Sequence, residues 1–393
     1  MGAAGSLDLR FVTHPRPLFQ EGRKGCVPRA KALGHSHDPV PAKYIRKFDM
    51  LDRFQRKITR LRISVTDLCN LYCVYCRPPQ GVHHMPRKEI LSFEEITLVA
   101  RCAAQLGVRS FRLTGGEPLT RRNLKSLVAS LSSIPGVEDL AMTTNGVLLR
   151  RYARALKEAG LMRINISLDS LQKERFRQIT GGGNIEDVLE GIEAAVDAGF
   201  EQVKVNMVVM RGINEDEVED FARLSMDKPL EVRFIEYMAF GCRMIEEKKF
   251  VPGQEVLERI RKVGDLVLAD AENPCRGGAA RSGRTAPPLR GPAKCYRLKG
   301  ARGVLGLILP VSQPFCGDCN RLRLTSQGKL RACLLSGGEV DLKTILRSEY
   351  LVSHGKPSAS LEKALVEAFI KASNMKPAIH SGRGEPVMCQ IGG

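Results

Sequence analysis

Two groups of three cysteines are the residues in this chain most suited to chemistry. The first group, Cys69, Cys73 and Cys76, has the spacing C-x3-C-x2-C. Cysteine thiolates hold iron–sulfur clusters and zinc in proteins. Four cysteines close a [4Fe–4S] cluster, whereas three leave one iron open to a small molecule. The spacing therefore predicts a metal centre that binds a ligand; the alternatives are a structural zinc site and reduced cysteines in the core.

The second group, Cys316, Cys319 and Cys333, has the spacing C-x2-C-x13-C and again lacks a fourth cysteine. Zinc is a strong alternative here, because a histidine such as His354 or His380 could complete the site. Spacing alone supports zinc and an open iron–sulfur cluster equally. No role is assigned to the cysteines that lack partner spacing, which are Cys26, Cys242, Cys275, Cys295 and Cys389.

The composition of the chain is that of a soluble globular protein, with 43% hydrophobic and 26% charged residues in 393. No apolar run approaches the roughly 20 residues that span a bilayer. The net charge of +18 favours an anionic partner: nucleic acid, a membrane surface or a phosphorylated small molecule. Because no signal-peptide segment is found, a reducing cytoplasm is expected, where clustered cysteines indicate metal or redox chemistry. A mitochondrial presequence is the alternative.

Strand-like and helix-like segments alternate between Leu61 and Met238. The β-rich runs are Leu61–Thr66, Ser110–Thr114, Asp139–Thr143, Met162–Leu168, Val203–Met210 and Val232–Tyr237. The helical segments are Ser92–Leu106, Leu124–Ile134, Leu148–Ala159, Ile185–Ala198 and Glu215–Leu224. Strands joined by crossover helices form a parallel sheet. Six such units are too few for an eight-stranded barrel, so we predict an α/β fold with a partial (β/α)6 barrel.

The unusual residues follow the C-terminal ends of these strands, where the chemistry of such folds is found. The cysteine loop Cys69–Cys76 follows the first strand, Thr114–Pro118 the second, Thr143–Gly146 the third and Ser167–Asp169 the fourth. The fifth strand carries Lys204 and Asn206, and the sixth carries Arg233, Glu236 and Met238. The pattern predicts one site at this edge of the sheet.

The remainder of the chain differs in composition. We predict a helix at Phe250–Val263, a long flexible loop at Asp270–Lys294, a hairpin at Arg321–Leu335, and helices near Val340–Leu346 and Ser360–Ala372. The predicted division is a poorly ordered extension (1–52), the partial barrel (53–245), a region with the second cysteine group (246–380) and a tail ending in Gly-Gly (381–393). Cys102, on the first helix, is predicted to lie in the core.

The first cysteine loop, with Tyr75 before its last cysteine, and the segment Thr114-Gly-Gly-Glu-Pro118 resemble the radical S-adenosylmethionine superfamily. The resemblance implies that the open iron of a [4Fe–4S] cluster chelates S-adenosylmethionine, whose reductive cleavage yields a 5′-deoxyadenosyl radical. It assigns S-adenosylmethionine contacts to Tyr75, Gly116, Ser167 and Met238. Glycines suit this role, because a missing side chain lets a ligand approach the backbone.

The second cysteine group lies in Phe315–Thr325 and Gly328–Leu334, which closely resemble the GTP 3′,8-cyclase family of molybdenum-cofactor biosynthesis. The similarity runs from Arg62 to Leu335 and resumes at Gln390–Gly393. It implies a second [4Fe–4S] cluster, held by Cys316, Cys319 and Cys333, whose open iron faces the purine of GTP. The GTP contacts that it implies are Arg62, Arg112, Thr143, Lys204, Arg321 and Arg323, with Arg233 as a further contact.

The activity implied by the resemblance is that of a radical S-adenosylmethionine lyase. GTP is converted to (8S)-3′,8-cyclo-7,8-dihydroguanosine 5′-triphosphate, the first step of molybdopterin biosynthesis. The implied cofactors are two [4Fe–4S] clusters and S-adenosylmethionine, and the implied partners are an electron donor and a pterin synthase that uses the product. A homodimer is expected from the resemblance alone, and neither a membrane nor a nucleic acid is an expected partner. No residue is assigned as a general acid or base.

Two other functions stay open. A radical S-adenosylmethionine enzyme that acts on a peptide or RNA would use the positive charge for a larger anion, and a non-enzymatic iron–sulfur protein would use the cysteines alone. The sequence also departs from the family. Ser110 stands where a lysine is common, Arg109 should point to the opposite face of the strand, and Ala239 replaces a proline. The resemblance further implies that Gly392-Gly393 reaches the active site.

Overall fold

The computed structural model describes residues 49–77, 84–238, 247–269, 292–350 and 358–380. The chain forms two compact units, residues 1–44 and 45–393, and every described residue belongs to the second. Several predictions lie outside the described residues: most of the N-terminal extension, residues 270–291 of the predicted loop, Ala239, the Gly-Gly tail, His354, and Cys26, Cys242, Cys275 and Cys389. In the part that is described, no helix combines the length and apolar character needed to cross a membrane.

Six parallel strands form the centre of the sheet. They are β1 (Arg60–Ser64), β2 (Ser110–Thr114), β3 (Asp139–Thr144), β4 (Arg163–Ser167), β5 (Gln202–Val209) and β6 (Glu231–Glu236). Each pairs in parallel with the next in chain order. This arrangement confirms the predicted α/β fold with a partial six-stranded barrel, and the predicted strands differ from it only at their ends.

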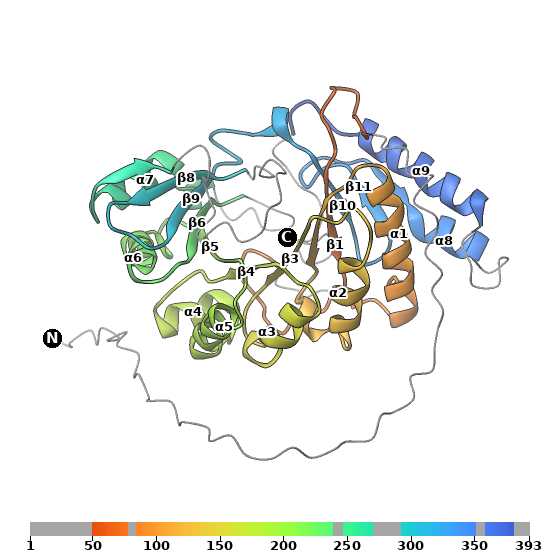
Figure 1. Cartoon of the computed structure of the whole chain (residues 1–393). Coiled ribbons are helices and arrows are strands. Elements are labelled where there is room, and N and C mark those ends of the chain that lie inside the picture. Colours follow the sequence, from red (N-terminus) through yellow and green to blue (C-terminus); the bar gives the residue numbers. More distant parts are fainter. Residues whose placement is uncertain (1–48, 78–83, 239–246, 270–291, 351–357, 381–393) are drawn as a thin grey trace, which may run out of the picture. The chain divides into compact units, whose positions relative to one another are not determined.

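Helices cover one face of this sheet (Figure 1). They are α1 (Phe93–Gln105), α2 (Leu124–Ser132), α3 (Leu149–Glu158), α4 (Lys173–Thr180), α5 (Ile185–Asp197) and α6 (Val218–Asp227). α1 begins with a complete capping box between Ser92 and Glu95, and its Cys102 is buried in the core. α4, a short polar helix directly before α5, was not predicted from the sequence, because few apolar residues mark its period.

Strands from the C-terminal part of the chain extend the sheet at both edges. β10 (Arg321–Leu324) pairs in parallel with β1, and β9 (Val304–Ile308) pairs in parallel with β6. The outer strands are β11 (Lys329–Arg331), β12 (Glu339–Asp341), β7 (Leu266–Leu268) and β8 (Lys294–Leu298). The full order is β12-β11-β10-β1-β2-β3-β4-β5-β6-β9-β8-β7. The sheet therefore continues across the predicted boundary near residue 245.

The remaining described helices are α7 (Gly253–Arg261), α8 (Leu342–Tyr350) and α9 (Ala359–Asn374). α8 and α9 pack against each other, and α9 also contacts α1 (Figure 1). The two faces of the sheet differ in kind. Alternate residues such as Ile63, Leu113 and Ile166 are buried against the helices, which leaves the intervening positions to the opposite face.

Candidate active site

The first cysteine group lies in the loop after β1. Cys69, Cys73 and Cys76 are half-buried. Backbone hydrogen bonds anchor the loop to the end of α4, from the Tyr72 amide to the Thr180 carbonyl (2.9 Å) and at the neighbouring Val74. Burial raises the pKa of the Cys73 thiol, and the nearby charges of Asp169 and Cys69 raise it further. Three thiols are thus held in one short, well-anchored loop, as a shared cluster requires.

The glycine pair after β2 packs tightly on this loop. A Cβ atom on Gly116 would lie 2.2 Å from the Leu68 carbonyl oxygen, and one on Gly115 would lie 2.6 Å from the Thr66 carbonyl oxygen. The Gly116 amide also donates to the Thr66 carbonyl (2.7 Å). The structure therefore gives the missing side chains a role the sequence did not suggest, close approach to the cysteine loop. Gly116 as an S-adenosylmethionine contact stays a prediction.

Glu117 connects the loops that follow three successive strands. Its carboxylate accepts hydrogen bonds from the Thr144 hydroxyl (2.7 Å) and the Asn145 amide (2.6 Å). The Glu117 amide donates to the Leu68 carbonyl (2.7 Å), and the Asn145 side chain lies 3.8 Å from the Cys69 sulfur. Burial raises the pKa of Glu117 to about 7, although its hydrogen bonds oppose the shift. Through its carboxylate and its backbone amide together, Glu117 connects the loops after β1, β2 and β3.

Asp169, just after β4, holds the tyrosine of the first cysteine loop. Its carboxylate accepts from the Tyr75 hydroxyl (2.6 Å) and from the Val208 amide (2.9 Å). Burial raises the pKa of Asp169 to about 6, against the effect of these two hydrogen bonds. Asp169 therefore joins the cysteine loop to β5.

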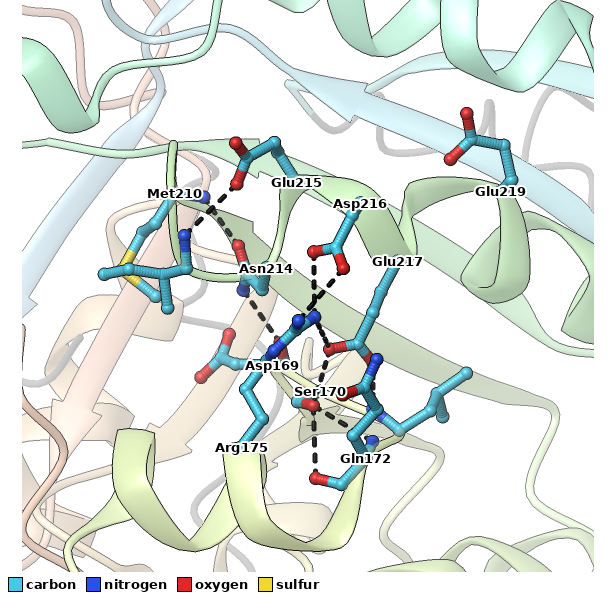
Figure 2. A network of polar contacts seen from close by, with 12 residues as sticks. Asp169, Ser170, Gln172, Arg175, Met210, Asn214, Glu215, Asp216, Glu217 and Glu219 are labelled. Carbon is cyan, nitrogen blue, oxygen red and sulfur yellow. Dashed lines mark hydrogen bonds and ion pairs between the residues drawn. The ribbon is translucent and has the colours of Figure 1, made fainter. Parts of the chain in front are cut away.

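A polar network behind Asp169 keeps this connection rigid (Figure 2). The Asn214 side chain donates to the backbone carbonyls of Asp169 (2.7 Å) and Val208 (2.9 Å). Beside it, the buried Glu217 accepts from the Ser170 hydroxyl (2.7 Å) and pairs with Arg175 (2.6 Å). These contacts connect the ends of β4 and β5.

The predicted S-adenosylmethionine contacts lie at one edge of the sheet. Tyr75 and Gly116 follow β1 and β2, Ser167 is the last residue of β4, and Met238 follows β6. Parallel strands place their C-terminal ends along the same edge, beside the first cysteine group. Their contacts with S-adenosylmethionine remain predictions.

The predicted GTP contacts share one face of the sheet. Arg62 lies beside Arg112 and Arg323 in register, and Lys204 lies two positions before the partner of Arg233. Side chains paired in register point to the same face, as do residues two apart in a strand. The structure therefore brings together all seven predicted residues: Arg62, Arg112, Thr143, Lys204, Arg233, Arg321 and Arg323.

Other polar residues on this face were not singled out from the sequence. They are Arg60, Asp139, Arg163, Asn165 and Glu231; the same face also carries Ser110 and Asn206, which were named from the sequence. Their spacing of two from residues in the predicted strands, as Arg60 stands two positions before Arg62, is the signal that could have found them. We call the positively charged residues on this face of the sheet the cationic face: Arg60, Arg62, Arg112, Arg163, Lys204, Arg233, Arg321 and Arg323.

Positive charge is in excess on the cationic face. Burial, together with the guanidiniums of Arg323 and Arg112, holds the pKa of Arg62 well below its ordinary value. Burial and the charges of Arg163 and Arg233 do the same for Arg112. Within the described residues neither Arg62 nor Arg112 forms an ion pair. Such mutual repulsion is relieved by an anion placed among these side chains.

Two carboxylates offset part of this charge. Asp139 pairs with Arg163 and accepts from the Ser110 hydroxyl (2.6 Å). Glu231 pairs with Lys204 (2.6 Å) and with Arg233. Burial would raise the pKa of Glu231, but the charges of Arg233 and Lys204 outweigh it and hold this pKa at about 2. Glu231 therefore stays ionised and orients both cations.

The departure at Ser110 has a clear structural outcome. The Ser110 hydroxyl faces Asp139, whereas Arg109 lies 3.8 Å from Glu138 on the helix-covered side. The alternation of the strand predicted that Arg109 would point away from the site, and it does. Arg109 therefore does not take the place of the lysine that is common in the family.

The second cysteine group lies at the other end of the β1–β10 pair. Cys316 and Cys319 immediately precede β10, and the antiparallel return of β11 brings Cys333 back to the same end. Burial raises the pKa of Cys319, but Arg321 and Lys376 outweigh it and lower this pKa to about 6. The Cys319 sulfur is therefore held in an environment that favours the thiolate, the form that binds metal.

The zinc alternative for the second cysteine group gains no support from His380, the one of its two candidate histidines that lies within the described residues. His380 Nε2 lies 3.1 Å from the Pro310 carbonyl oxygen. Among the described residues, no three Cys, His, Asp or Glu side chains could hold a single metal ion. A [4Fe–4S] cluster does not need that convergence, because each of its thiolates binds a different iron.

Comparisons with known proteins agree with this arrangement. Residues 63–225 match the model of the radical SAM superfamily, and residues 230–381 match Molybdenum Cofactor Synthesis C. The GTP 3′,8-cyclase of Pelotomaculum thermopropionicum is 47% identical over 88% of this chain and 100% of its own length. The chain belongs to the GTP 3′,8-cyclase family. The GTP 3′,8-cyclase of Moorella thermoacetica is 46% identical over the same shares of the two chains.

Membership of the GTP 3′,8-cyclase family makes the chain a radical S-adenosylmethionine enzyme and confirms that prediction. A [4Fe–4S] cluster and S-adenosylmethionine are implied by the superfamily, and the first cysteine loop fits them. Among solved structures, Streptococcus suis SuiB has a TM-score of 0.53 with 12% sequence identity, over 80% of this chain and 65% of that one. That likeness supports the fold alone.

Proposed function

We propose that this chain converts GTP to (8S)-3′,8-cyclo-7,8-dihydroguanosine 5′-triphosphate, the first step of molybdopterin biosynthesis. The observation that carries the proposal is the position of the cationic face. Arg60 and Arg62, with Arg321 and Arg323 beside them, lie on strands that run from the second cysteine group to the first. At about 3.3 Å per residue, these strands span roughly 15 Å, a length suited to a nucleoside triphosphate.

The residues of the cationic face supply binding and orientation. Arg62 and Arg112 are free to bind phosphate oxygens in the bidentate manner typical of arginine. Lys204 and Arg233, held by Glu231, add fixed positive charge nearby. When bound, the first cluster and S-adenosylmethionine supply a 5′-deoxyadenosyl radical. The contribution of the protein is to fix the ribose so that only one hydrogen is within reach of that radical.

The finer parts of the proposal concern the second cysteine group and the partners. Cys316, Cys319 and Cys333 would hold a second [4Fe–4S] cluster, and the iron that lacks a cysteine would offer a binding position for the purine. The lowered pKa of Cys319 and the hairpin that brings Cys333 back support this assignment. An electron donor reduces the first cluster, a pterin synthase uses the product, and the enzyme works in the cytoplasm as a homodimer.

The test is anaerobic turnover with a reductant, S-adenosylmethionine and GTP deuterated at the ribose 3′ position. We expect deuterium in the 5′-deoxyadenosine, measured by mass spectrometry. Unlabelled 5′-deoxyadenosine would show that the radical does not take the 3′ hydrogen of GTP, which contradicts GTP as the substrate while leaving the radical chemistry in place. If no 5′-deoxyadenosine forms although the iron content is complete, the proposed activity is wrong.

A further inference from the structure

A buried lysine contacts the second cysteine group. Lys376 follows the end of α9, and only 2% of its surface is exposed. Its ammonium donates to the backbone carbonyls of Arg321 (2.8 Å) and Ala332 (3.1 Å) and to the Cys319 sulfur (3.3 Å). An ammonium has three donors, so these three contacts use its full capacity.

The contacts of Lys376 join both parts of the second cysteine group. Cys319 and the Arg321 carbonyl belong to the segment that enters β10, whereas Ala332 directly precedes Cys333 after β11. Lys376 therefore connects the two chain segments that carry the three cysteines, the loop with two of them and the strand end with the third.

The charge of Lys376 needs an anion. Among the described residues, no carboxylate pairs with this ammonium. A neighbouring buried cation shows the contrast: Arg56 pairs with Asp52 (2.6 Å) while it donates to the carbonyls of Cys316 (2.6 Å) and Pro377 (2.9 Å). A buried charge is costly unless it is paired. The sulfur of Cys319 is therefore the partner that the structure offers to Lys376.

We propose that Lys376 is a positioning residue for the second iron–sulfur cluster. Its side chain holds Cys319 and the segment that carries Cys333, and its charge offsets the negative charge of the cluster. This inference rests on the proposed function, because it requires a cluster at the second cysteine group. A [4Fe–4S] cluster bound by three thiolates is an anion and becomes more negative when it gains an electron. Hydrogen bonds and positive charge at its sulfurs therefore favour the reduced form and raise the reduction potential.

The test uses full-length chains that retain one cysteine group each. Replacing Cys69, Cys73 and Cys76 by alanine leaves only the second group, and replacing Cys316, Cys319 and Cys333 leaves only the first. Lys376→Met removes the charge while keeping the length and apolar character of the side chain. Lys376→Gln removes the charge but keeps a hydrogen-bond donor, and it serves if the methionine variant does not fold. Lys371→Met, at an exposed position of α9, is the matched control.

The measurements are iron content after anaerobic reconstitution, the rate of iron loss to a chelator, and the midpoint potential followed by electron paramagnetic resonance. In the chain that retains the second group, we expect Lys376→Met to accelerate iron loss by about 10- to 100-fold, because losing an outer-shell partner typically lowers metal affinity by this factor and the lower affinity appears as faster release. We also expect a more negative midpoint potential, with a smaller shift for Lys376→Gln. Lys371→Met should change neither the rate of iron loss nor the midpoint potential.

The chain that retains the first group separates a specific effect from misfolding. We expect Lys376→Met to leave its iron content and potential unchanged. Equal loss of iron from both chains would mean that Lys376 supports the fold generally, and an unchanged second cluster would mean that it has no role there; either result overturns the inference. If the second group takes up no iron even with Lys376 intact, the proposed second cluster is wrong, and the inference falls with it.

Discussion

Neighbouring side chains of the cationic face differ in how their charge is balanced. Lys204 and Arg233 share the buried carboxylate of Glu231, whereas Arg62 and Arg112 form no ion pair within the described residues. The first pair is fixed before any substrate arrives. Arg62 and Arg112 can instead pair with an incoming anion. Substitutions at the first pair should therefore change stability, and substitutions at the second pair should change substrate affinity.

For Glu231→Gln we expect a loss of about 3 kcal/mol in the free energy of unfolding at pH 7, because Lys204 is left buried without its carboxylate. Urea denaturation of the purified chain measures it. The pKa of Glu231 falls from its ordinary value of 4.5 to about 2 on folding. The carboxylate therefore stabilises the protein above pH 4.5, and the difference between the two chains should shrink as pH falls toward 2.

Glu190→Gln is the control for Glu231→Gln, since Glu190 pairs with Arg150 in solvent. Its effect should stay within about 0.5 kcal/mol, as for exposed pairs generally. A loss for Glu231→Gln no larger than this, or one that does not change with pH, would show that the buried carboxylate does not stabilise the face.

For Arg62→Ala we expect GTP to bind about 10- to 100-fold more weakly, because charged hydrogen bonds to phosphate are lost. The affinity for GMP should fall much less than the affinity for GTP, so that the ratio of the two affinities becomes smaller. Anaerobic calorimetry measures both affinities, and Arg150→Ala, at an exposed arginine, is the control. Equal weakening of GTP and GMP would place Arg62 away from the outer phosphates.

Close packing between loops positions the first cysteine group. The glycine pair after β2 approaches the backbone of the cysteine loop, Glu117 connects the loops after β1 and β3, and Asp169 anchors Tyr75 to β5. Each contact joins the ends of neighbouring elements. The loop that carries Cys69 therefore depends on strands that are distant in sequence.

For Gly116→Ala we expect loss of the first cluster, because the new Cβ would lie 2.2 Å from the Leu68 carbonyl oxygen and displace the loop before Cys69. Such overpacking typically costs about 1 to 3 kcal/mol. Iron content after reconstitution should fall to that of the second group alone. Gly337→Ala is the control, since a Cβ there meets nothing within 4 Å. Retention of both clusters in Gly116→Ala would contradict the proposed role of the glycine.

The sheet unites the two regions that the family models match separately. β9 and β10 come from the C-terminal region, yet they pair with the edge strands β6 and β1 of the barrel. Leu305 in β9 is fully buried in the same core as the barrel strands. Because the core is shared, we expect the two regions to unfold together.

For Leu305→Ala we expect the free energy of unfolding to fall by about 3 kcal/mol, because the substitution leaves a cavity in the core. Hydrogen exchange should show lower protection in β5 as well as in β9, because one cooperative unit contains both strands. Val267→Ala, at a half-exposed position of β7, should change little. A loss of protection confined to β7, β8 and β9 would instead show that the C-terminal strands unfold on their own.

Local signals in the sequence were sufficient for the six barrel strands, for most of the helices and for the cysteine groups. The helical segment predicted from Ser92 matches the start of α1, and the six β-rich runs predicted the barrel strands. These features depend on residues a few positions apart. By contrast, α4 was missed for want of an apolar period, and the role of Gly116 against Leu68 was not visible, because it depends on two loops that meet only in the fold.

The sequence by itself determined the strand alternation, the two incomplete cysteine groups and the cations that lie on the strands, since these follow from residue type and short-range spacing. Only the tertiary structure decided that β10 pairs with β1, which places Arg321 beside Arg60 and the two cysteine groups at opposite ends of one strand pair. It also decided that Lys376 lies against Cys319, 57 positions away in the chain. Such pairings depend on which strand covers which edge, and that choice comes from burial of the whole core rather than from any local pattern.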